Sequence, residues 1–331
     1  MALLYAGIDE AGYGPLLGPL CVGLAVVRLD AWKSGDPAPD LWELLAPGVC
    51  RKPRDPKHRV AIADSKALKL PSSTKTLHPL VHLERGVLSI LACLPDADPV
   101  ADPIADDDAL LSSVGADLGD LPWYAGSPMP LPVGSTAAEL AIAANLVRAA
   151  ATRAHTAFVD LRCAVVPEPR FNRIVEASGT KAETTVACIG EHLRCVIDRL
   201  AKPGDEIRVV CDRLGGRLGY AGILARELKP HAVRTIAETP GGCVYEVAGA
   251  AGPAYIRFEP GSEERHWPVA LASMLAKFVR ELAMARFNRY WGARDPRLKP
   301  TAGYRGDASR WLKDAGGLLT RADREAMIRR A

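Results

Sequence analysis

The sequence lacks closely spaced cysteines and any strong excess of charge. Its eight cysteines are scattered along the chain, and no two of them are separated by only two residues. This spacing argues against a zinc ribbon or a disulfide framework and favours reduced, buried cysteines in a cytoplasmic protein. A net charge of +3 with a pI of about 8.4 is only mildly basic. Any affinity for nucleic acid must therefore come from a local group of cations.

The sequence also has no apolar segment long enough to cross a membrane. The longest uncharged stretch near the N-terminus, residues 11–27, is interrupted by glycine and proline and follows two acids instead of basic residues. It therefore fits neither a signal peptide nor a membrane span. Internal repeats are missing as well. We expect a cytoplasmic monomer with no membrane partner.

One region stands out by its composition. At 331 residues with 48% hydrophobic content, the chain is long for a single domain and can bury a substantial core. Between Asp96 and Asp120 there are eight aspartates, together with prolines and glycines and without aromatic residues. This composition predicts a surface insertion over about residues 96–134 that has little core of its own.

Hydrophobic patterning predicts strands interleaved with long helices, which is typical of a layered α/β domain. Residues 3–9 and 22–29 are expected to form a hairpin-like pair around a glycine-rich loop. Thr136 and Glu139 have the spacing of a capping box and predict a helix that runs to about residue 152. Further strands are predicted over 85–94, 157–166, 207–211, 242–247 and 254–258, and further helices over 66–84, 181–201, 267–291, 307–315 and 320–330.

Two adjacent acids, Asp9 and Glu10, stand at the end of the first predicted strand. Successive strand residues point to opposite faces, so both acids can address one site only where the strand ends or bends, which the following glycines permit. Carboxylate oxygens are the ligands that Mg²⁺ prefers. The pair is thus a candidate metal site, and the alternative is a solvated strand end. A dinucleotide-binding loop is excluded because Pro15 and Pro19 stand where its helix should begin.

The segment GIDEAGYGPLLGP at residues 7–19 resembles the opening motif of the type 2 ribonucleases H, ribonucleases HII and HIII. The resemblance implies a ribonuclease H-like α/β fold with a mixed central β-sheet flanked by helices. Asp9 and Glu10 would be the first two catalytic, metal-binding acids. The third would be Asp212, which also ends an apolar strand. Residues 1–290 would form the catalytic domain, and 291–331 a basic helical segment that packs on it.

The fourth acid of this family precedes a helix, and two residues compete for that role. Aligning ALASMLAK at residues 270–277 without a gap places the acid at Glu263, whereas anchoring on Pro268 places it at Glu264. We prefer Glu263, because the run WPVALAS matches the helix start better than a single proline does.

A second segment, ADSKAL at residues 63–68, is similar to the family segment DSKxL. It implies that Lys66 lies near a substrate phosphate or the metal site. The structural alternative is that Asp64 and Ser65 merely cap a helix. Residues 167–182 also resemble a segment of the ribonuclease HIII branch.

Further residues are expected to contact substrate. The peptide groups of the loop through Gly12, Tyr13 and Gly14 are suited to read a 2′-hydroxyl, because glycines allow close approach of the backbone. The segment AGYRGD makes Tyr304 a candidate to stack on a sugar, as the resemblance implies, and packing against the last helices is the alternative. Phosphate contacts are expected from Lys66, Lys277, Arg280, Arg286, Arg289 and Arg294.

Together the motifs imply a metal-dependent endoribonuclease that cleaves the RNA strand of RNA/DNA hybrids with two Mg²⁺ or Mn²⁺ ions and leaves 5′-phosphate and 3′-hydroxyl ends. Tyr13 departs from the family, which has Arg or Lys between the two glycines. Asp212 and Glu263 are 51 positions apart, more than compact members need, and we expect no extra N-terminal domain of the HIII kind. The sequence is compatible with both the ribonuclease HII and the ribonuclease HIII branch. The alternatives are a non-catalytic nucleic-acid-binding protein on this fold and a nuclease with a different substrate.

Overall fold

A seven-stranded mixed sheet forms the centre of the computed structural model, which describes residues 2–95 and 104–330. The strand order is β5-β2-β1-β6-β9-β8-β7. The central strands β1, β6 and β9 are parallel, and the remaining neighbours are antiparallel. The strands are β1 (Leu3–Ala11), β2 (Leu20–Leu29), β5 (Thr156–Val166), β6 (Glu206–Asp212), β7 (Val233–Thr239), β8 (Gly242–Gly249) and β9 (Gly252–Glu259), and a separate pair is β3 (Val49–Cys50) with β4 (Val60–Ala61).

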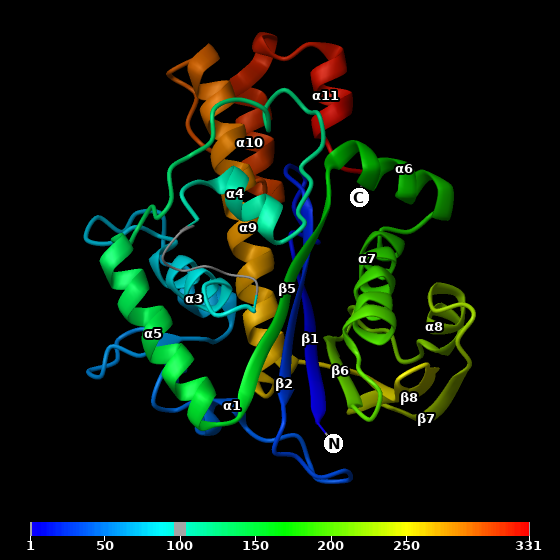
Figure 1. Cartoon of the computed structure of the whole chain (residues 1–331). Helices are drawn as coiled ribbons and strands as arrows, with labels where there is room; N and C mark the ends of the chain where they lie inside the picture. Colours follow the sequence, from blue (N-terminus) through cyan, green and yellow to red (C-terminus); the bar gives the residue numbers. More distant parts are fainter. Residues whose placement is uncertain (1, 96–103, 331) are drawn as a thin grey trace.

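Helices cover both faces of this sheet (Figure 1). One face packs against α9 (Trp267–Arg294), with α3 (Val81–Leu91) and α5 (Ala137–Arg153) outside it. The other face packs against α7 (Ala182–Arg194), its π-helical continuation (Cys195–Leu200) and α8 (Ala221–Glu227). The shorter helices are α1 (Leu41–Leu44), α2 (Ser65–Leu68), α4 (Asp107–Ser113), α6 (Glu168–Ser178), α10 (Arg305–Ala315) and α11 (Arg321–Met327), with 3₁₀ turns η2 (Ser262–Glu264) and η3 (Gly316–Leu318).

The alternation of β1 explains how the sheet serves two cores. Leu3 and Tyr5 belong to the core beneath α9, whereas Leu4 and Ala6 belong to the core beneath α7. This is the period of two that a strand buried on both faces must show. The mixed sheet flanked by helices confirms the predicted fold class.

Close backbone approach seats α9 on the sheet. A Cβ at Gly7 of β1 would overlap the backbone of Pro268 and Val269, and a Cβ at Gly23 of β2 would overlap that of Ala272. Only glycine fits such a contact. The first turns of α9 therefore lie directly over the end of β1, where the paired acids stand.

Most predicted elements are present, but two predicted elements were wrong and one strand of the central sheet was missed. Residues 85–94 are mainly helix α3, because a continuous apolar run cannot distinguish a buried strand from a buried helix. Within 66–84 only the start of α3 and the single turn of α2 are helical, and the prolines at 71 and 79 lie in the loop between them. Strand β7 was missed because it is a largely exposed strand without an apolar run.

The predicted surface insertion contributes to the core. Trp123 and Tyr124 are buried, and Asp107 pairs through its carboxylate with Arg286 of α9 at 2.6 Å. The expectation of little core was thus wrong for residues 104–134, because a few large side chains late in the segment anchor it. Residues 96–103 of this prediction lie outside the described residues.

The C-terminal segment joins the same core through Trp291, Trp311 and Met327. Helix α9 continues past residue 290 to Arg294, so the predicted division at 290/291 falls inside a helix. The eight cysteines are free thiols, and all but the half-buried Cys93 are buried. Among the described residues, no helix is both long and apolar enough to span a membrane.

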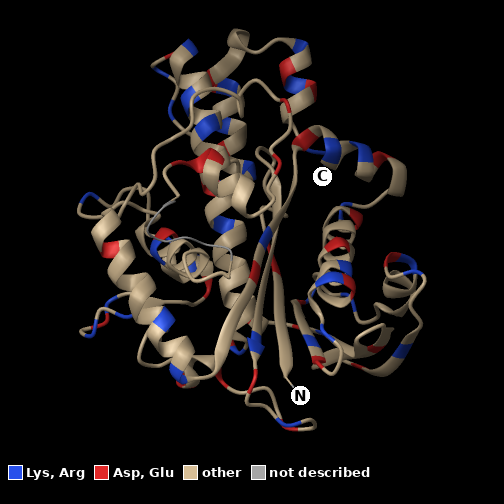
Figure 2. Ribbon diagram, in the orientation of Figure 1, with Lys and Arg blue, Asp and Glu red and all other residues tan. Residues whose placement is uncertain are grey.

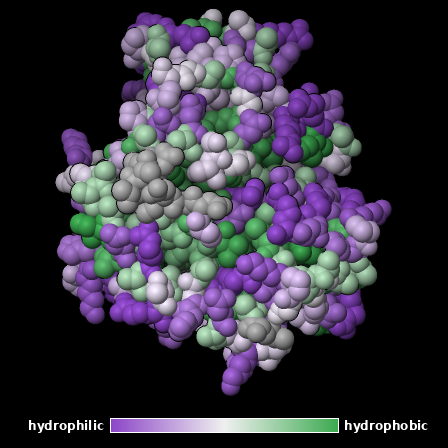
Figure 3. Space-filling view, viewed as in Figure 1, coloured by the Kyte–Doolittle hydropathy of each residue, from purple (hydrophilic) through white to green (hydrophobic). Residues whose placement is uncertain are grey.

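Charge is spread over the molecule. Figure 2 shows Lys and Arg interspersed with Asp and Glu on helices of both faces. Figure 3 shows hydrophilic residues gathered over α6 and α7 on the side that is viewed. A site lined by cations therefore has to be identified from the positions of individual side chains.

Candidate active site

Three parallel strands bring the predicted acids to one edge of the sheet. Asp9 and Glu10 stand near the end of β1, and Asp212 ends the neighbouring β6, where Cys211 is in register with Ile8. Next to it, Glu259 ends β9 and leads into the 3₁₀ turn η2, which carries Glu263. Because carboxyl ends of parallel strands share an edge, residues more than 200 positions apart in the chain meet there.

The acids perturb one another electrostatically. Burial raises the pKa of Asp9 well above its usual value, and the negative charges of Glu10 and Asp212 raise it further. Burial also raises the pKa of Glu10 to about 7, with added repulsion from Asp212 and Glu263. The pKa of Glu263 is raised by burial and by Asp212. The strand register places Asp9, Glu10 and Asp212 at the same end of neighbouring strands, and the mutual effects on pKa agree with that placement.

Serines hold two of these carboxylates in place. Asp212 accepts hydrogen bonds through Oδ1 from the backbone N–H and the hydroxyl of Ser262, at 3.3 and 3.2 Å. A hydrogen bond from Ser273 of α9 lowers the pKa of Asp9 and partly offsets its burial. The hydroxyl of Ser65, the first residue of α2, lies 3.0 Å from the Ser273 hydroxyl and can donate to it. Neither Ser262 nor Ser273 was predicted as a site residue, although Ser273 lies within the ALASMLAK motif.

The structure distinguishes the two candidates for the fourth acid. Glu263 is half-buried, and its Oε2 atom is buried without a hydrogen-bond partner. Glu264 is exposed, and its recorded hydrogen bond uses its backbone carbonyl, which accepts from Arg51 at 2.8 Å. An unpartnered carboxylate oxygen beside other acids is the geometry of a ligand, so Glu263 remains our choice.

Lys66 lies beside the acids. Burial alone would lower its pKa, but Asp64, Glu263 and Asp9 outweigh burial and raise it. Asp64 also caps α2 by accepting a hydrogen bond from the Lys66 backbone N–H at 3.0 Å. The interpretation of Asp64 as a helix cap is therefore confirmed. The edge of the sheet that carries Asp9, Glu10, Asp212 and Glu263 is called the acidic edge here, and the cap places the Lys66 side chain beside it.

The loop between β1 and β2, residues 12–19, is called the glycine loop here. Gly12 has a φ of +93°, and a Cβ there would meet the Arg280 side chain and the Pro19 carbonyl. Gly14 is exposed with open space around it, as an approach to substrate requires. Tyr13 is half-buried, and burial, with added repulsion from Glu10, raises its pKa.

Lys277 and Tyr304, two residues predicted to contact substrate, lie close to each other. Tyr304 is 47% exposed, and the Lys277 Nζ lies 5.7 Å from the centre of its ring. Lys277 itself is buried and paired with Glu281 at 2.8 Å. It can contact a phosphate only at the expense of that pair.

Two of the four arginines on α9 that were predicted to contact phosphate are buried, and the other two are exposed. Arg280 is fully buried and donates to the carbonyls of Leu17 and Ala302. Arg286 is buried in its ion pair with Asp107. The other two, Arg289 and Arg294, donate to backbone carbonyls, and Arg294 also lies over the ring of Tyr290. The buried positions of Arg280 and Arg286 therefore exclude them as phosphate contacts, whereas Arg289 and Arg294 stay predictions.

The sequence analysis did not predict that C-terminal residues contact the glycine loop. Arg329 is buried and donates to the carbonyls of Gly12 and Gly18 and, at 3.0 Å, to that of Tyr13. Asn172 clamps the same segment, because its side chain donates to the Ile328 carbonyl at 2.9 Å and accepts from the Arg330 N–H at 2.7 Å. Asn172 lies in the 167–182 segment that resembles ribonuclease HIII. That resemblance was the feature of the sequence that could have pointed to Asn172.

The donor set fits a divalent cation. Among the described residues, no three acids, histidines or cysteines are already arranged around one point as ligands. The pKa values of Asp9, Glu10 and Glu263 are nevertheless raised, with the charge of Asp212 among the causes, and Glu263 keeps a buried oxygen unpartnered. A hard cation would relieve both the repulsion and the missing contact, so the residues present suit Mg²⁺ or Mn²⁺.

No family model matches the chain, and no curated protein sequence matches it. Among solved structures, the chain is similar to ribonuclease HII of Archaeoglobus fulgidus, in a complex with PCNA, with 15% identity and a TM-score of 0.45 over 99% of this chain and 94% of that one. It is similar to ribonuclease H2 of Pyrococcus horikoshii OT3 with 14% identity and a TM-score of 0.40, over 95% and 86%. For Bst-RNase HIII in complex with Mn²⁺ the values are 16% and 0.41, over 98% and 66%. These are type 2 ribonucleases H, the family whose motifs the sequence resembles.

Proposed function

We propose that this chain is a metal-dependent endonuclease that hydrolyses the RNA strand of RNA/DNA hybrids. The observation that carries the proposal is the meeting of Asp9, Glu10, Asp212 and Glu263 at one sheet edge, each on an element that the ribonuclease H motifs mark. Structural roles alone do not explain this arrangement, because burying like charges together destabilises a fold.

The four carboxylates would hold Mg²⁺ or Mn²⁺. When bound, the ions supply Lewis-acid stabilisation of the charge that develops at the scissile phosphate. Side chains of the protein orient the carboxylates and offset negative charge. Ser262 and Ser273 fix the orientation of the carboxylates of Asp212 and Asp9. Lys66 offsets negative charge beside the site and is free to contact a phosphate oxygen.

Selection of RNA would rest on the glycine loop. Gly14 leaves its peptide group open, so a 2′-hydroxyl can approach the backbone closely. The exposed ring of Tyr304 is available to stack on a sugar or base near the cut. Cleavage would leave a 5′-phosphate and a 3′-hydroxyl, as the resemblance implies.

The experiment is a comparison of three substrates of one sequence: an RNA/DNA hybrid, the single-stranded RNA and the DNA duplex, each end-labelled. We expect Mg²⁺-dependent or Mn²⁺-dependent cleavage of the RNA in the hybrid and no cleavage of the DNA duplex. Ligation or phosphatase sensitivity of the products identifies the 5′-phosphate. Binding of the hybrid without cleavage in either metal would support the non-catalytic alternative, and preferred cleavage of another substrate would support a nuclease of different specificity.

A further inference from the structure

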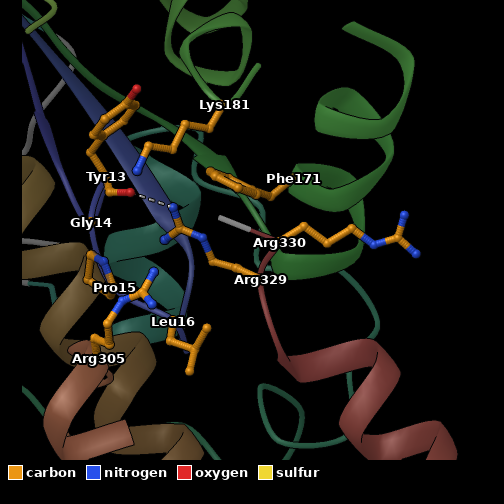
Figure 4. A pocket seen from close by; sticks show the side chains of 9 residues that line it. All are labelled: Tyr13, Gly14, Pro15, Leu16, Phe171, Lys181, Arg305, Arg329 and Arg330. Carbon is orange, nitrogen blue, oxygen red and sulfur yellow. Dashed lines mark hydrogen bonds between the residues drawn. The ribbon is translucent and has the colours of Figure 1, made fainter. Parts of the chain in front are cut away.

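A cation-lined pocket lies beside the glycine loop, and none of the four acids is among its lining residues. Its volume is about 260 Å³, and Tyr13, Gly14, Lys181, Arg305 and Arg329 are among its lining residues. Figure 4 shows the lysine alongside the Tyr13 ring, Arg305 reaching in from α10 and Arg329 between the glycine loop and α6. The cations come from three segments that are far apart in the sequence, so their convergence is a property of the fold.

Arg329 makes this pocket more than a group of surface charges. Its side chain is only 3% exposed, and its Nε atom is buried without a hydrogen-bond partner. Its guanidinium lies 3.8 Å from the centre of the Phe171 ring, which fixes the plane of the group. Burial and the nearby charge of Arg280 lower its pKa to about 10, and it remains a cation at neutral pH. Among residues 2–95 and 104–330, no carboxylate forms a salt bridge with this buried positive charge.

Two other cations of the pocket are available for a ligand. Among the described residues, neither Lys181 nor Arg305 forms a salt bridge, and the Lys181 Nζ lies over the Tyr13 ring at 4.9 Å from its centre. They stand at the starts of α7 and α10. Thr180 Oγ1 accepts from the first N–H of α7 at 3.3 Å, whereas no side-chain cap is formed at α10 among the described residues, and a helix N-terminus favours anions. The fourth cation, Arg330, is already paired with Glu176 at 3.1 Å and points away from the pocket in Figure 4.

We propose that this pocket binds one backbone phosphate of the nucleic acid held at the acidic edge. Tyr13 connects the two sites, because it lines the pocket and follows Glu10 by three residues in the chain. The pocket thereby supplies positive charge at the loop position where this chain has a tyrosine in place of a basic residue. This inference rests on the proposed function and adds residues from the C-terminal segment and from α7 to the substrate-binding surface.

The test is the double variant Lys181→Gln/Arg305→Gln, which spares the buried Arg329. Its matched control is Lys33→Gln/Arg153→Gln, which removes the same two charges from exposed residues near the opposite end of the sheet, where Leu29 pairs with Thr156. The dissociation constant of a fluorescent RNA/DNA hybrid is measured in chelator at several salt concentrations, together with kcat and KM in Mg²⁺.

We expect the pocket variant to bind the hybrid about tenfold more weakly, with a salt slope reduced by about 1, as loss of one phosphate contact requires. KM should rise while kcat stays near that of the wild type, and the control should match the wild type. Equal binding by the pocket and control variants, in an enzyme that cleaves the hybrid, would overturn the pocket and leave the proposed function intact. If inorganic phosphate raised the melting temperature of the wild type alone while hybrid binding was equal in both variants, the pocket would hold a free phosphate and the proposal would be wrong. A wild type that neither binds nor cleaves nucleic acid would overturn the proposed function itself.

Discussion

Arg329 donates a hydrogen bond to the carbonyl of Gly12, although 317 positions separate the two residues. The backbone N–H of Arg329 also donates to the Leu16 carbonyl at 2.9 Å. The C-terminal segment thus closes over the loop that follows the paired acids. Because the loop depends on glycine and carries few side chains of its own, these contacts fix its shape from outside.

Replacing Arg329 with glutamine should lower the free energy of unfolding by roughly 1–3 kcal/mol, because carbonyls of the glycine loop lose their buried donor. The matched control is Arg330→Gln, whose salt bridge with Glu176 is 60% and 67% exposed and contributes at most about 1 kcal/mol. Urea unfolding of both variants gives the comparison. Equal stability of the two would show that the C-terminal contact does not hold the loop.

The two candidates for the fourth acid differ in their expected effects on cleavage. Glu263→Gln should lower kcat by at least roughly tenfold, about 1.4 kcal/mol in the barrier, because it removes a ligand charge from the acidic edge. Glu264→Gln should stay close to the wild type, since its side chain is exposed. The measurement is the initial rate at which each variant cleaves the RNA/DNA hybrid. A larger loss in Glu264→Gln than in Glu263→Gln would show that the helix motif must be aligned one residue later.

Stability without metal should depend on pH in a defined direction. The pKa of Glu10 is raised from 4.5 to about 7, so the folded protein keeps a proton that the unfolded chain loses. In chelator, the free energy of unfolding should therefore fall as pH rises from about 4.5 to about 7. Asp9, Asp212, Glu263 and Lys66 are the charged groups that influence this carboxyl group. The pKa values of Asp9 and Glu263 are also raised, so these two acids act in the same direction.

Mg²⁺ should reverse that loss, because it binds the charged carboxylates. The increase in melting temperature on adding Mg²⁺ should be larger at about pH 8 than at about pH 5.5. Glu10→Gln provides the control: it should be more stable than the wild type in chelator at the higher pH and should respond less to Mg²⁺. A metal response that is the same at both pH values would contradict the site.

Tyr13 should influence which substrate is preferred. A phenol lacks the fixed charge and the bidentate fork of a guanidinium. We therefore expect the wild type to cleave a long RNA/DNA hybrid faster than a duplex that contains a single ribonucleotide. Tyr13→Arg should shift the ratio of the two initial rates toward the single ribonucleotide. An unchanged ratio would show that this position does not read the junction, and a wild type that already favours the single ribonucleotide would contradict the idea.

The acids could be predicted because each follows a local pattern. Asp9 and Asp212 end apolar strands, and Glu263 precedes a helix with a recognisable start, so short segments sufficed. The parallel pairing of β1 with β6 then brings them together without further information.

The long-range contacts could not be predicted. Nothing near Arg329 in the sequence indicates that it packs on Phe171 and reaches the glycine loop, because that contact depends on how α6 and α11 pack. Arg286 was misjudged for a related reason. Its partner Asp107 lies in an aspartate-rich segment that reads as solvent-exposed, yet the pair is buried. Periodicity describes one element at a time, whereas burial of a charge depends on its partner.

The most direct test of the account is the initial rate of cleavage of a labelled RNA/DNA hybrid in Mg²⁺ by the wild type and by Asp9→Asn. The substitution removes a ligand charge without changing side-chain volume, and it relieves repulsion in the metal-free protein. We predict that cleavage by the wild type requires the metal, that the variant loses it while folding normally by circular dichroism, and that Asp212→Asn behaves alike. Comparable turnover by Asp9→Asn and the wild type at saturating Mg²⁺ would contradict the assignment of the acidic edge as the catalytic site.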